Sequence, residues 1–174
     1  MRGYVRQIIC DKRERRTKFE AYLDRSFGQC LLGDSRVAEL VQKNLLHFDG
    51  KSYRLFAWVI VPNHVHALIE MGDVALAQVV KSWKSYTSKE ANRLLRREGR
   101  FWEPEYFDRC IRDEEHFRKA VRYIESNPVK ARVVREPAEW QWSSAHGPSA
   151  QTGSISKTVS IATRGQDVRT PGTP

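Results

Sequence analysis

The stretch YRLFAWVIVPNHVHALIEM, residues 53–71, indicates the centre of the fold. Its first part, residues 53–61, is rich in the β-branched and aromatic residues that favour strands. Pro62 and Asn63 then supply turn chemistry, and an extended pattern resumes over residues 64–71. We therefore expect a β-hairpin whose two strands lie in the middle of the fold.

The segments around this hairpin show helical or strand character. Apolar periodicity and N-cap residues predict helices at residues 13–24, 34–46, 76–95 and 113–127. Pro128 interrupts the last helix, and a short strand is expected at residues 106–112. The order of helix, hairpin, helix, strand and helix indicates an α+β fold.

The chain of 174 residues has the length of one domain. We expect that domain at residues 1–146, with residues 1–20 divergent or truncated. Residues 147–174 are rich in Gly, Ser, Thr, Pro and Gln without a sustained period, so we expect a disordered tail there.

The charge favours a polyanionic partner. Lys and Arg outnumber Asp and Glu by 30 to 21, a net charge of +9, which makes nucleic acid the first candidate.

The sequence has neither the roughly 18 consecutive apolar residues of a membrane span nor a secretory signal, so we expect a cytoplasmic, nucleoid-associated protein. Three widely spaced cysteines are expected to be reduced thiols: Cys10, Cys30 and Cys110.

His64 and His66 are separated by one residue in the second expected strand. Because alternate side chains of a strand share a face, the two imidazoles project together, about 6.5 to 7 Å apart along the backbone, and can bind one divalent ion. A surface histidine beside a hydrogen-bonded core histidine explains the same pattern. The metal interpretation needs a third ligand.

Tyr123 and Asn127 lie four residues apart in the last expected helix, one above the other beside an apolar stripe. A half-buried tyrosine with its hydroxyl at the surface gives the same pattern. Combined with the histidine pair, the two residues supply a covalent nucleophile and a cation ligand for phosphodiester cleavage. The oxygen of Asn127 suits Mg²⁺ or Mn²⁺.

Several ordered motifs carry a resemblance to a known family. They are AWVIVPNHVH at 57–66, FW at 101–102, YFDR at 106–109, RDEEH at 112–116 and YIESNPVKA at 123–131. With these motifs the sequence resembles the REP-associated tyrosine transposases, IS200-like members of the HUH single-strand DNA endonucleases. The likeness runs from about residue 22 to residue 145.

The resemblance implies a ferredoxin-like antiparallel sheet with helices packed on one face. It implies a metal site formed by His64, His66 and Asn127. It also implies that Tyr123 attacks a single-strand phosphodiester, keeps the 5′ phosphate as a phosphotyrosine and releases a free 3′ hydroxyl. The implied substrates are imperfect palindromic hairpins with a short recognition sequence, and the sequence is compatible with a monomer or a homodimer.

The start of the chain departs from this family, whose first strand is hydrophobic and central in the sheet. Only residues 4–9, before the charges of residues 11–18, fit such a strand. An unpaired central strand exposes backbone donors and acceptors. One alternative is therefore a catalytically impaired DNA-binding remnant of a transposase. Another is a metal phosphoesterase that uses the histidine pair without covalent catalysis.

Tyr86 is the rival nucleophile, with Glu90 four residues ahead as its possible ligand. His116 is expected about 10 Å from Tyr123 along the helix, too far to share a ligand sphere with Asn127.

Basic and aromatic residues form the predicted DNA surface. Lys119, one turn before Tyr123, is expected either to favour the phenolate or to bind the DNA backbone. Phe101 and Trp102 either stack on bases or belong to the core. The expected phosphate contacts, each of which has a solvated charge as its alternative, are Lys81, Lys84, Arg93, Arg96, Arg97, Arg100, Lys119 and Lys130.

Overall fold

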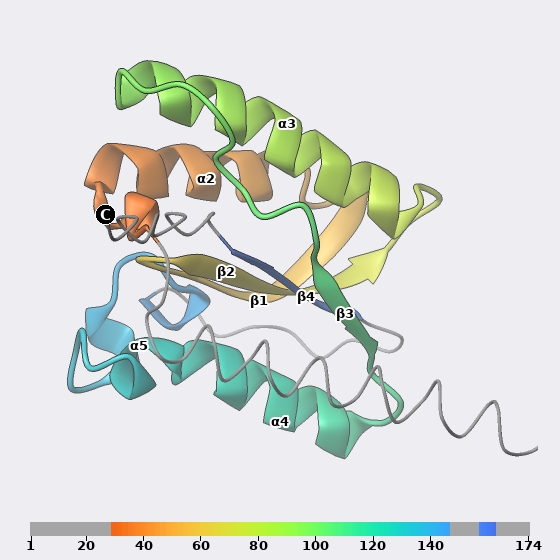
Figure 1. Cartoon of the computed structure of the whole chain (residues 1–174). Helices are drawn as coiled ribbons and strands as arrows, with labels where there is room; N and C mark the ends of the chain where they lie inside the picture. The colour runs from red at the N-terminus through yellow and green to blue at the C-terminus, as the bar shows by residue number, and fades with distance from the viewer. Residues whose placement is uncertain (1–28, 147–156, 163–174) are drawn as a thin grey trace, which may run out of the picture.

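The computed structural model describes residues 29–146 and 157–162 (Figure 1). Its helices are α2 (Ser35–His47), α3 (Leu76–Leu94), α4 (Glu114–Glu125) and the short α5 (Asn127–Lys130). Its strands are β1 (Tyr53–Val61), β2 (His64–Met71), β3 (Phe107–Cys110) and β4 (Lys157–Ala162). Three short 3₁₀ turns are η1 (Leu31–Gly33), η2 (Pro137–Glu139) and η3 (Ser144–His146).

The predicted hairpin is confirmed. β1 and β2 pair antiparallel from Tyr53 opposite Met71 to Val61 opposite His64, and the two-residue turn between them is Pro62-Asn63. The register shifts once, between Leu55 and Ala57. This long ladder fixes which side chains of β2 point to each face of the sheet.

The sheet has the order β1-β2-β4-β3, and every neighbouring pair is antiparallel. The expectation of a disordered tail over residues 147–174 is therefore wrong for residues 157–162, because these residues form β4 in the interior of the sheet. Its buried residues Val159 and Ile161 pack into the core beside α2 and α3. Hydrogen bonding to β2 on one side and β3 on the other stabilises a strand that its own composition does not predict.

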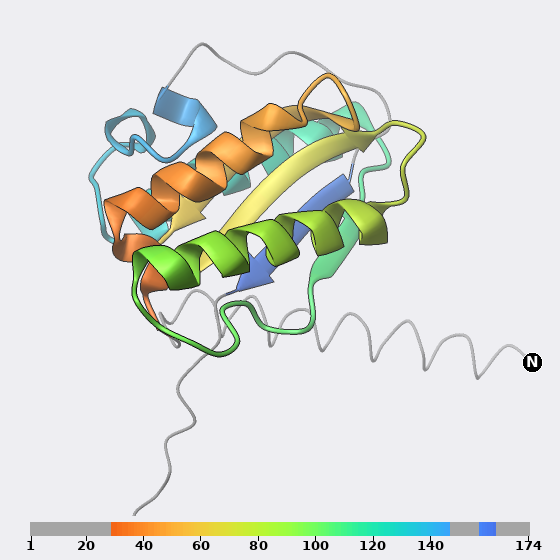
Figure 2. The ribbon, with the colours of Figure 1, turned by 90° about the horizontal axis from the view of Figure 1, so that it is seen from above.

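Helices cover both faces of the sheet, which corrects the expectation that they pack on one face. α2 and α3 lie side by side over one face, as Figure 2 shows from above, and α4 lies under the other (Figure 1). The reason is the composition of β1, in which Val61 and every residue from Phe56 to Ile60 is buried. A strand that is apolar on both sides needs a layer on each. Trp58 and Ile60 contact the α2 and α3 layer, whereas Val59 and Val61 contact α4.

The three predicted helices that fall within the described residues occur with small shifts at their ends. Asp34 caps α2 by accepting from Arg36 N at 2.9 Å, and Asp113 caps α4 by accepting from His116 N at 2.7 Å. α4 ends at Glu125 instead of continuing to Asn127, because Pro128 lacks the N–H that would extend the ladder. Asn127 instead begins α5, so Tyr123 and Asn127 lie on successive helices.

The strand expected at residues 4–9 and the helix expected at residues 13–24 lie outside the described residues. No helix of the described part is long and apolar enough to cross a membrane. Cys30 and Cys110 are exposed free thiols, as expected, and Cys10 falls outside the described residues.

Candidate functional site

The site begins with His64 and His66, which project from β2 toward the α4 side of the sheet. The alternating core contacts establish this, because Leu68 packs with α4 while Val65 lies in the core on the other face. Both imidazoles are buried, at 2% and 1% exposure, and their Nε2 atoms lie 3.0 Å apart. The two ring nitrogens thus converge on one point.

A hydrogen-bond partner also holds each imidazole at its second ring nitrogen, Nδ1. Nδ1 of His64 lies 2.8 Å from Oδ1 of Asn63, and Nδ1 of His66 lies 2.6 Å from Oγ of Ser160 on β4. Because Asn63 Oδ1 is an acceptor, the Nδ1 of His64 donates to it. The neutral ring of His64 then accepts at Nε2, where the Nε2–H of His66 donates.

Burial lowers the pKa of both imidazoles. For His66 the pKa falls to about 4, with the charge of Lys130 as a second cause. For His64 the pKa falls well below its ordinary value, because of burial first and the neighbouring His66 second, while a hydrogen bond to Asn127 opposes the change. Both rings are therefore neutral at pH 7, the form in which imidazole binds metal ions.

Asn127 adds the third group. It is 2% exposed, and its buried amide nitrogen Nδ2 has no hydrogen-bond partner. A buried amide nitrogen without a partner is destabilising. The hydrogen bond to His64 places this amide against the imidazoles. Among the described residues no three His, Cys, Asp or Glu side chains come together, so a cation here would be held by two imidazoles and an amide oxygen. This donor set fits a divalent cation.

Tyr123 of α4 lies against this group. Its ring centroid is 5.5 Å from that of His66, at an interplanar angle of 67°. The ring packs beside the core cluster of Phe56, Val59 and Leu68, so α4 holds the phenol at the edge of the buried site. The structure thus brings together the four residues His64, His66, Tyr123 and Asn127 that the sequence predicted from separate segments.

Lys130 brings a positive charge next to the Tyr123 ring. Its Nζ lies over the Tyr123 ring, 4.1 Å from the centroid, and Lys130 is the last residue of α5. Lys119 instead forms an ion pair with Glu115 at 2.6 Å, on an exposed part of α4. Helical spacing had placed the charge of Lys119 near Tyr123, but in the structure Glu115 already neutralises that charge. The role of Lys119 stays a prediction.

The rival nucleophile lies elsewhere. Tyr86 is 52% exposed on α3, across the sheet from the histidine pair, and Glu90 pairs with Arg93 at 3.0 Å. The Nδ1 atom of His116 accepts from Arg112 N at 3.4 Å near the start of α4. Neither Tyr86 nor His116 joins the site.

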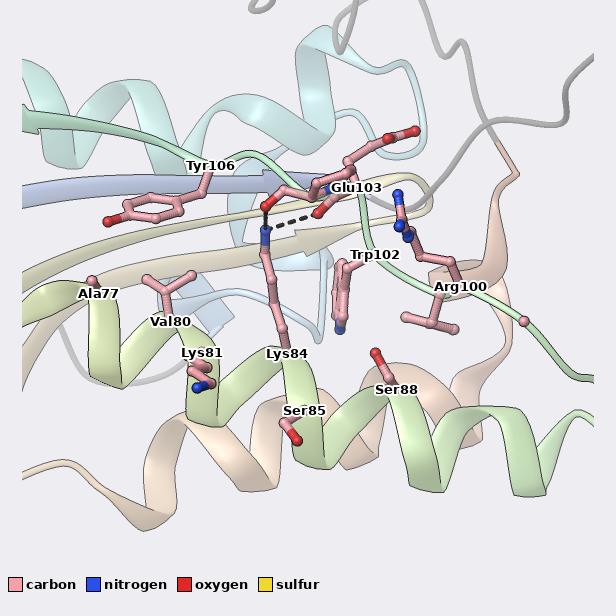
Figure 3. A pocket seen from close by; sticks show the side chains of 13 residues that line it. Ala77, Val80, Lys81, Lys84, Ser85, Ser88, Arg100, Trp102, Glu103 and Tyr106 are labelled. Carbon is pink, nitrogen blue, oxygen red and sulfur yellow. Dashed lines mark hydrogen bonds between the residues drawn. The ribbon is translucent and has the colours of Figure 1, made fainter.

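The basic residues of α3 lie on the face opposite Tyr123. Beside them a hollow of about 460 Å³ separates α3 from residues 99–106 (Figure 3). The ammonium of Lys84 crosses this hollow and donates to the carbonyls of Glu103 and Glu105 at 2.9 and 2.8 Å. Burial lowers the pKa of Lys84 to about 8.

The other residues predicted to contact DNA differ in their exposure to solvent. Phe101 and Trp102 are buried, and the indole nitrogen of Trp102 donates to Thr87 Oγ1 at 2.8 Å, which supports the core interpretation for both. Lys81 and Arg100 are exposed at the hollow. Contacts of any of these basic residues with phosphate stay predictions.

Sequence reasoning missed Asn63 and Ser160 as partners of the two imidazoles. Asn63 had a signal, because it directly precedes His64 and its side chain can accept a hydrogen bond. Ser160 had none, because it lies 94 residues from His66 in a segment of tail-like composition.

The sequence model of the family Transposase IS200 like matches residues 33–127, more than half of the chain, so the protein belongs to the IS200-like transposases. A curated relative is the REP-associated tyrosine transposase of Escherichia coli (strain K12). The two sequences are 26% identical over 98 residues, which are 55% of this chain and 56% of the relative. The chain thus spans about half the length of that relative.

A solved structure described as the REP-associated tyrosine transposase bound to a REP hairpin is also similar. Its TM-score is 0.55 at 22% identity, over 73% of this chain and 78% of the other. At this identity the likeness concerns the fold. The α+β antiparallel architecture and the resemblance drawn from the sequence motifs are both confirmed.

Proposed function

We propose that this chain cleaves and rejoins single-stranded DNA, with Tyr123 as the nucleophile and a divalent cation at His64, His66 and Asn127. Membership of a transposase family supports the reaction class. The similar solved structure is that of a protein bound to a REP hairpin, and on that basis we propose hairpin DNA as the substrate. Such a substrate implies a nucleoid-associated protein.

One observation carries the proposal: the ring of Tyr123 lies 5.5 Å from that of His66, whose Nε2 converges with the Nε2 of His64. A phenol and a pair of neutral imidazoles are thereby held within reach of a single phosphate. The alternative of an ordinary core histidine does not explain why two buried imidazoles converge beside a buried amide whose Nδ2 has no partner.

The chemistry follows from this arrangement. The phenolic oxygen of Tyr123 attacks the phosphorus and forms an O–P bond as it loses its proton. The bond from phosphorus to the 3′ oxygen breaks, and that oxygen takes up a proton to become a free 3′ hydroxyl. The 5′ phosphate stays on Tyr123, so attack by another 3′ hydroxyl restores a phosphodiester without any external energy source.

His64, His66 and Asn127 would hold the cation, which we propose to be Mg²⁺ or Mn²⁺. Bound there, it would polarise the phosphate and offset the charge that develops during attack. Burial keeps the imidazoles neutral and therefore available as ligands. The ammonium of Lys130, beside the Tyr123 ring, supports both a phosphate contact and stabilisation of the phenolate.

The test is covalent trapping. The full-length protein is incubated with Mn²⁺ and a labelled DNA hairpin that carries a single-stranded flank, and then denatured. We expect a labelled protein band that survives denaturation, disappears with a chelator and is absent in Tyr123→Phe. The matched control is Tyr86→Phe, which removes the hydroxyl of an exposed tyrosine on the opposite face and should leave the adduct intact.

The other outcomes point to the alternatives. Cleavage that persists in Tyr123→Phe without an adduct indicates a metal phosphoesterase. Hairpin binding by the wild-type protein without cleavage or adduct indicates a DNA-binding remnant. Either result contradicts the proposed function.

A further inference from the structure

β4 contributes one polar side chain to the interior of the site. Ser160 is 7% exposed and lies directly opposite His66 in the ladder between β2 and β4. Residues paired in this way project from the same face of the sheet. The neighbouring Val159 and Ile161 point the other way, into the core beside α2 and α3. The alternation of β4 therefore directs the Ser160 hydroxyl to the imidazole.

We propose that Ser160 is a positioning residue, whose hydroxyl holds Nδ1 of His66 so that Nε2 points at the cation position. This inference rests on the proposed function. The 2.6 Å contact between Ser160 Oγ and His66 Nδ1 sets the direction of the ring, because the bond from one ring nitrogen orients the other. The described side-chain hydrogen bond of Ser160 is to His66, so Ser160 would act through that ring.

A hydroxyl suits this position because it both donates and accepts. In the structure, the Nε2–H of His66 points at Nε2 of His64, and Nδ1 of His66 accepts from Ser160. If His64 and His66 held a cation through their Nε2 atoms, both nitrogens would have to be unprotonated, and the proton of His66 would then reside on Nδ1. Ser160 retains its hydrogen bond by rotating its hydroxyl and accepting from that N–H.

Among the described hydrogen bonds, Ser160 is the partner of Nδ1 of His66. No described carboxylate or amide helps to orient the ring at this nitrogen. A carboxylate would bond only to the protonated nitrogen and would favour a single tautomer. The serine therefore allows the proton to move between the ring nitrogens without loss of ring orientation.

The test compares Ser160→Ala, which lacks the hydroxyl, with Ser160→Thr, which keeps it and suits a strand. The matched control is Ser143→Ala, since Ser143 is also a buried serine, with a hydroxyl that accepts from Ala145 N at 3.2 Å, and makes no described contact with the imidazoles. Mn²⁺ affinity is measured on the full-length protein without DNA. We expect about a tenfold or greater loss in Ser160→Ala, as for other partners that orient metal-binding histidines. Ser160→Thr and Ser143→Ala should bind like the wild type.

Imidazole ¹⁵N spectra of the metal-free protein give a second measurement. We expect the Nδ1 resonance of His66 to shift downfield in Ser160→Ala, because the nitrogen loses its donor, and to stay in place in Ser160→Thr. Amide exchange at Val159 and Ile161 checks that β4 remains paired. Unchanged Mn²⁺ affinity in a Ser160→Ala protein with β4 paired overturns the inference.

The proposed function and this inference fail in different ways. If the wild-type protein binds no Mn²⁺, the metal part of the proposed function is wrong, and the metal-free spectra decide about Ser160. An unchanged His66 resonance in Ser160→Ala then overturns the inference. If Mn²⁺ binds and depends on Ser160 but no DNA adduct forms, the inference stands and the cleavage proposal does not.

Discussion

At the residue scale, burial and hydrogen bonding act together on the imidazoles of His64 and His66. Burial keeps both rings neutral, and partners at Nδ1 hold both rings so that their Nε2 atoms lie 3.0 Å apart. Neutral buried imidazoles are costly to protonate. The pair therefore resists binding protons, and its neutral rings support the proposed cation site.

Stability of the metal-free protein should fall as the pH decreases from 6.5 toward 4. The folded-state pKa of His66, about 4, lies below its ordinary value of 6.5, so within this window the unfolded chain binds more protons than the folded one. The contribution is fully present above pH 6.5 and is lost as the pH falls. Thermal unfolding in a chelator, measured from pH 4 to 8, follows this loss.

The control for the pH series is a pair of matched substitutions. His66→Gln should flatten the decline below pH 6.5, whereas His47→Gln, at the exposed end of α2, should leave its slope unchanged. Equal slopes in wild type and His66→Gln would refute the assignment to this ring.

A second residue-scale prediction concerns the charge beside the nucleophile. Lys130→Gln should slow cleavage at pH 7 about tenfold, because a cation within a few ångströms favours the ionised form of the phenol. Its Nζ lies 4.1 Å from the Tyr123 ring centroid. Single-turnover cleavage at saturating DNA gives the rate.

Lys119→Gln is the matched comparison, since Lys119 lies on α4 one turn before Tyr123 but pairs with Glu115. It should change the rate much less than Lys130→Gln. A larger effect at Lys119 would restore the sequence-based assignment of that residue.

At the scale of elements, β4 shows how a strand within a Gly-, Ser- and Thr-rich segment becomes part of the core. It lies between β2 and β3, and its residues Val159 and Ile161 are 1% and 2% exposed. It completes the sheet at the position next to the histidine strand. The sheet and the site therefore depend on the same six residues, Lys157–Ala162.

Ile161→Ala should lower the free energy of unfolding by about 2 to 5 kcal/mol, the range for truncating a buried isoleucine. Urea unfolding of the full-length protein measures the change. Val133→Ala, at a position 38% exposed, is the comparison and should stay within about 0.5 kcal/mol of wild type. An equally small effect at Ile161 would mean that residues 157–162 do not pack in the core.

The hairpin could be predicted from sequence because its signals are local. Apolar residues fill β1, the turn residues are Pro62 and Asn63, and the two-residue period places both histidines on one face. β4 could not be predicted, since its pairing partners in β2 lie about 90 residues away and its flanks resemble a disordered segment. For the same reason Ser160 was missed, although Tyr123 and Asn127 were found from helical spacing.

At the scale of the whole molecule, the sheet separates two surfaces that carry basic residues. α4 and α5, which carry Tyr123 and Lys130, lie on one side of the sheet, and α3 with its basic residues lies on the other (Figure 1). A hairpin whose cleavage point is at Tyr123 must extend past an edge of the sheet to reach α3. The net charge of +9 favours such an extended contact.

Lys81→Ala and Arg100→Ala, combined, should therefore weaken hairpin binding and make the slope of log affinity against log salt shallower by about 1.4 to 1.8, the release expected for two phosphate contacts. Both residues are exposed beside the hollow at α3. The cleavage rate at saturating DNA should stay near wild type, because neither residue is near Tyr123. Lys43→Ala, which removes an exposed lysine paired with Glu39 on α2, is the matched control and should leave the slope unchanged. If the double variant also keeps the wild-type slope, Lys81 and Arg100 make no phosphate contact, and their charges are solvated.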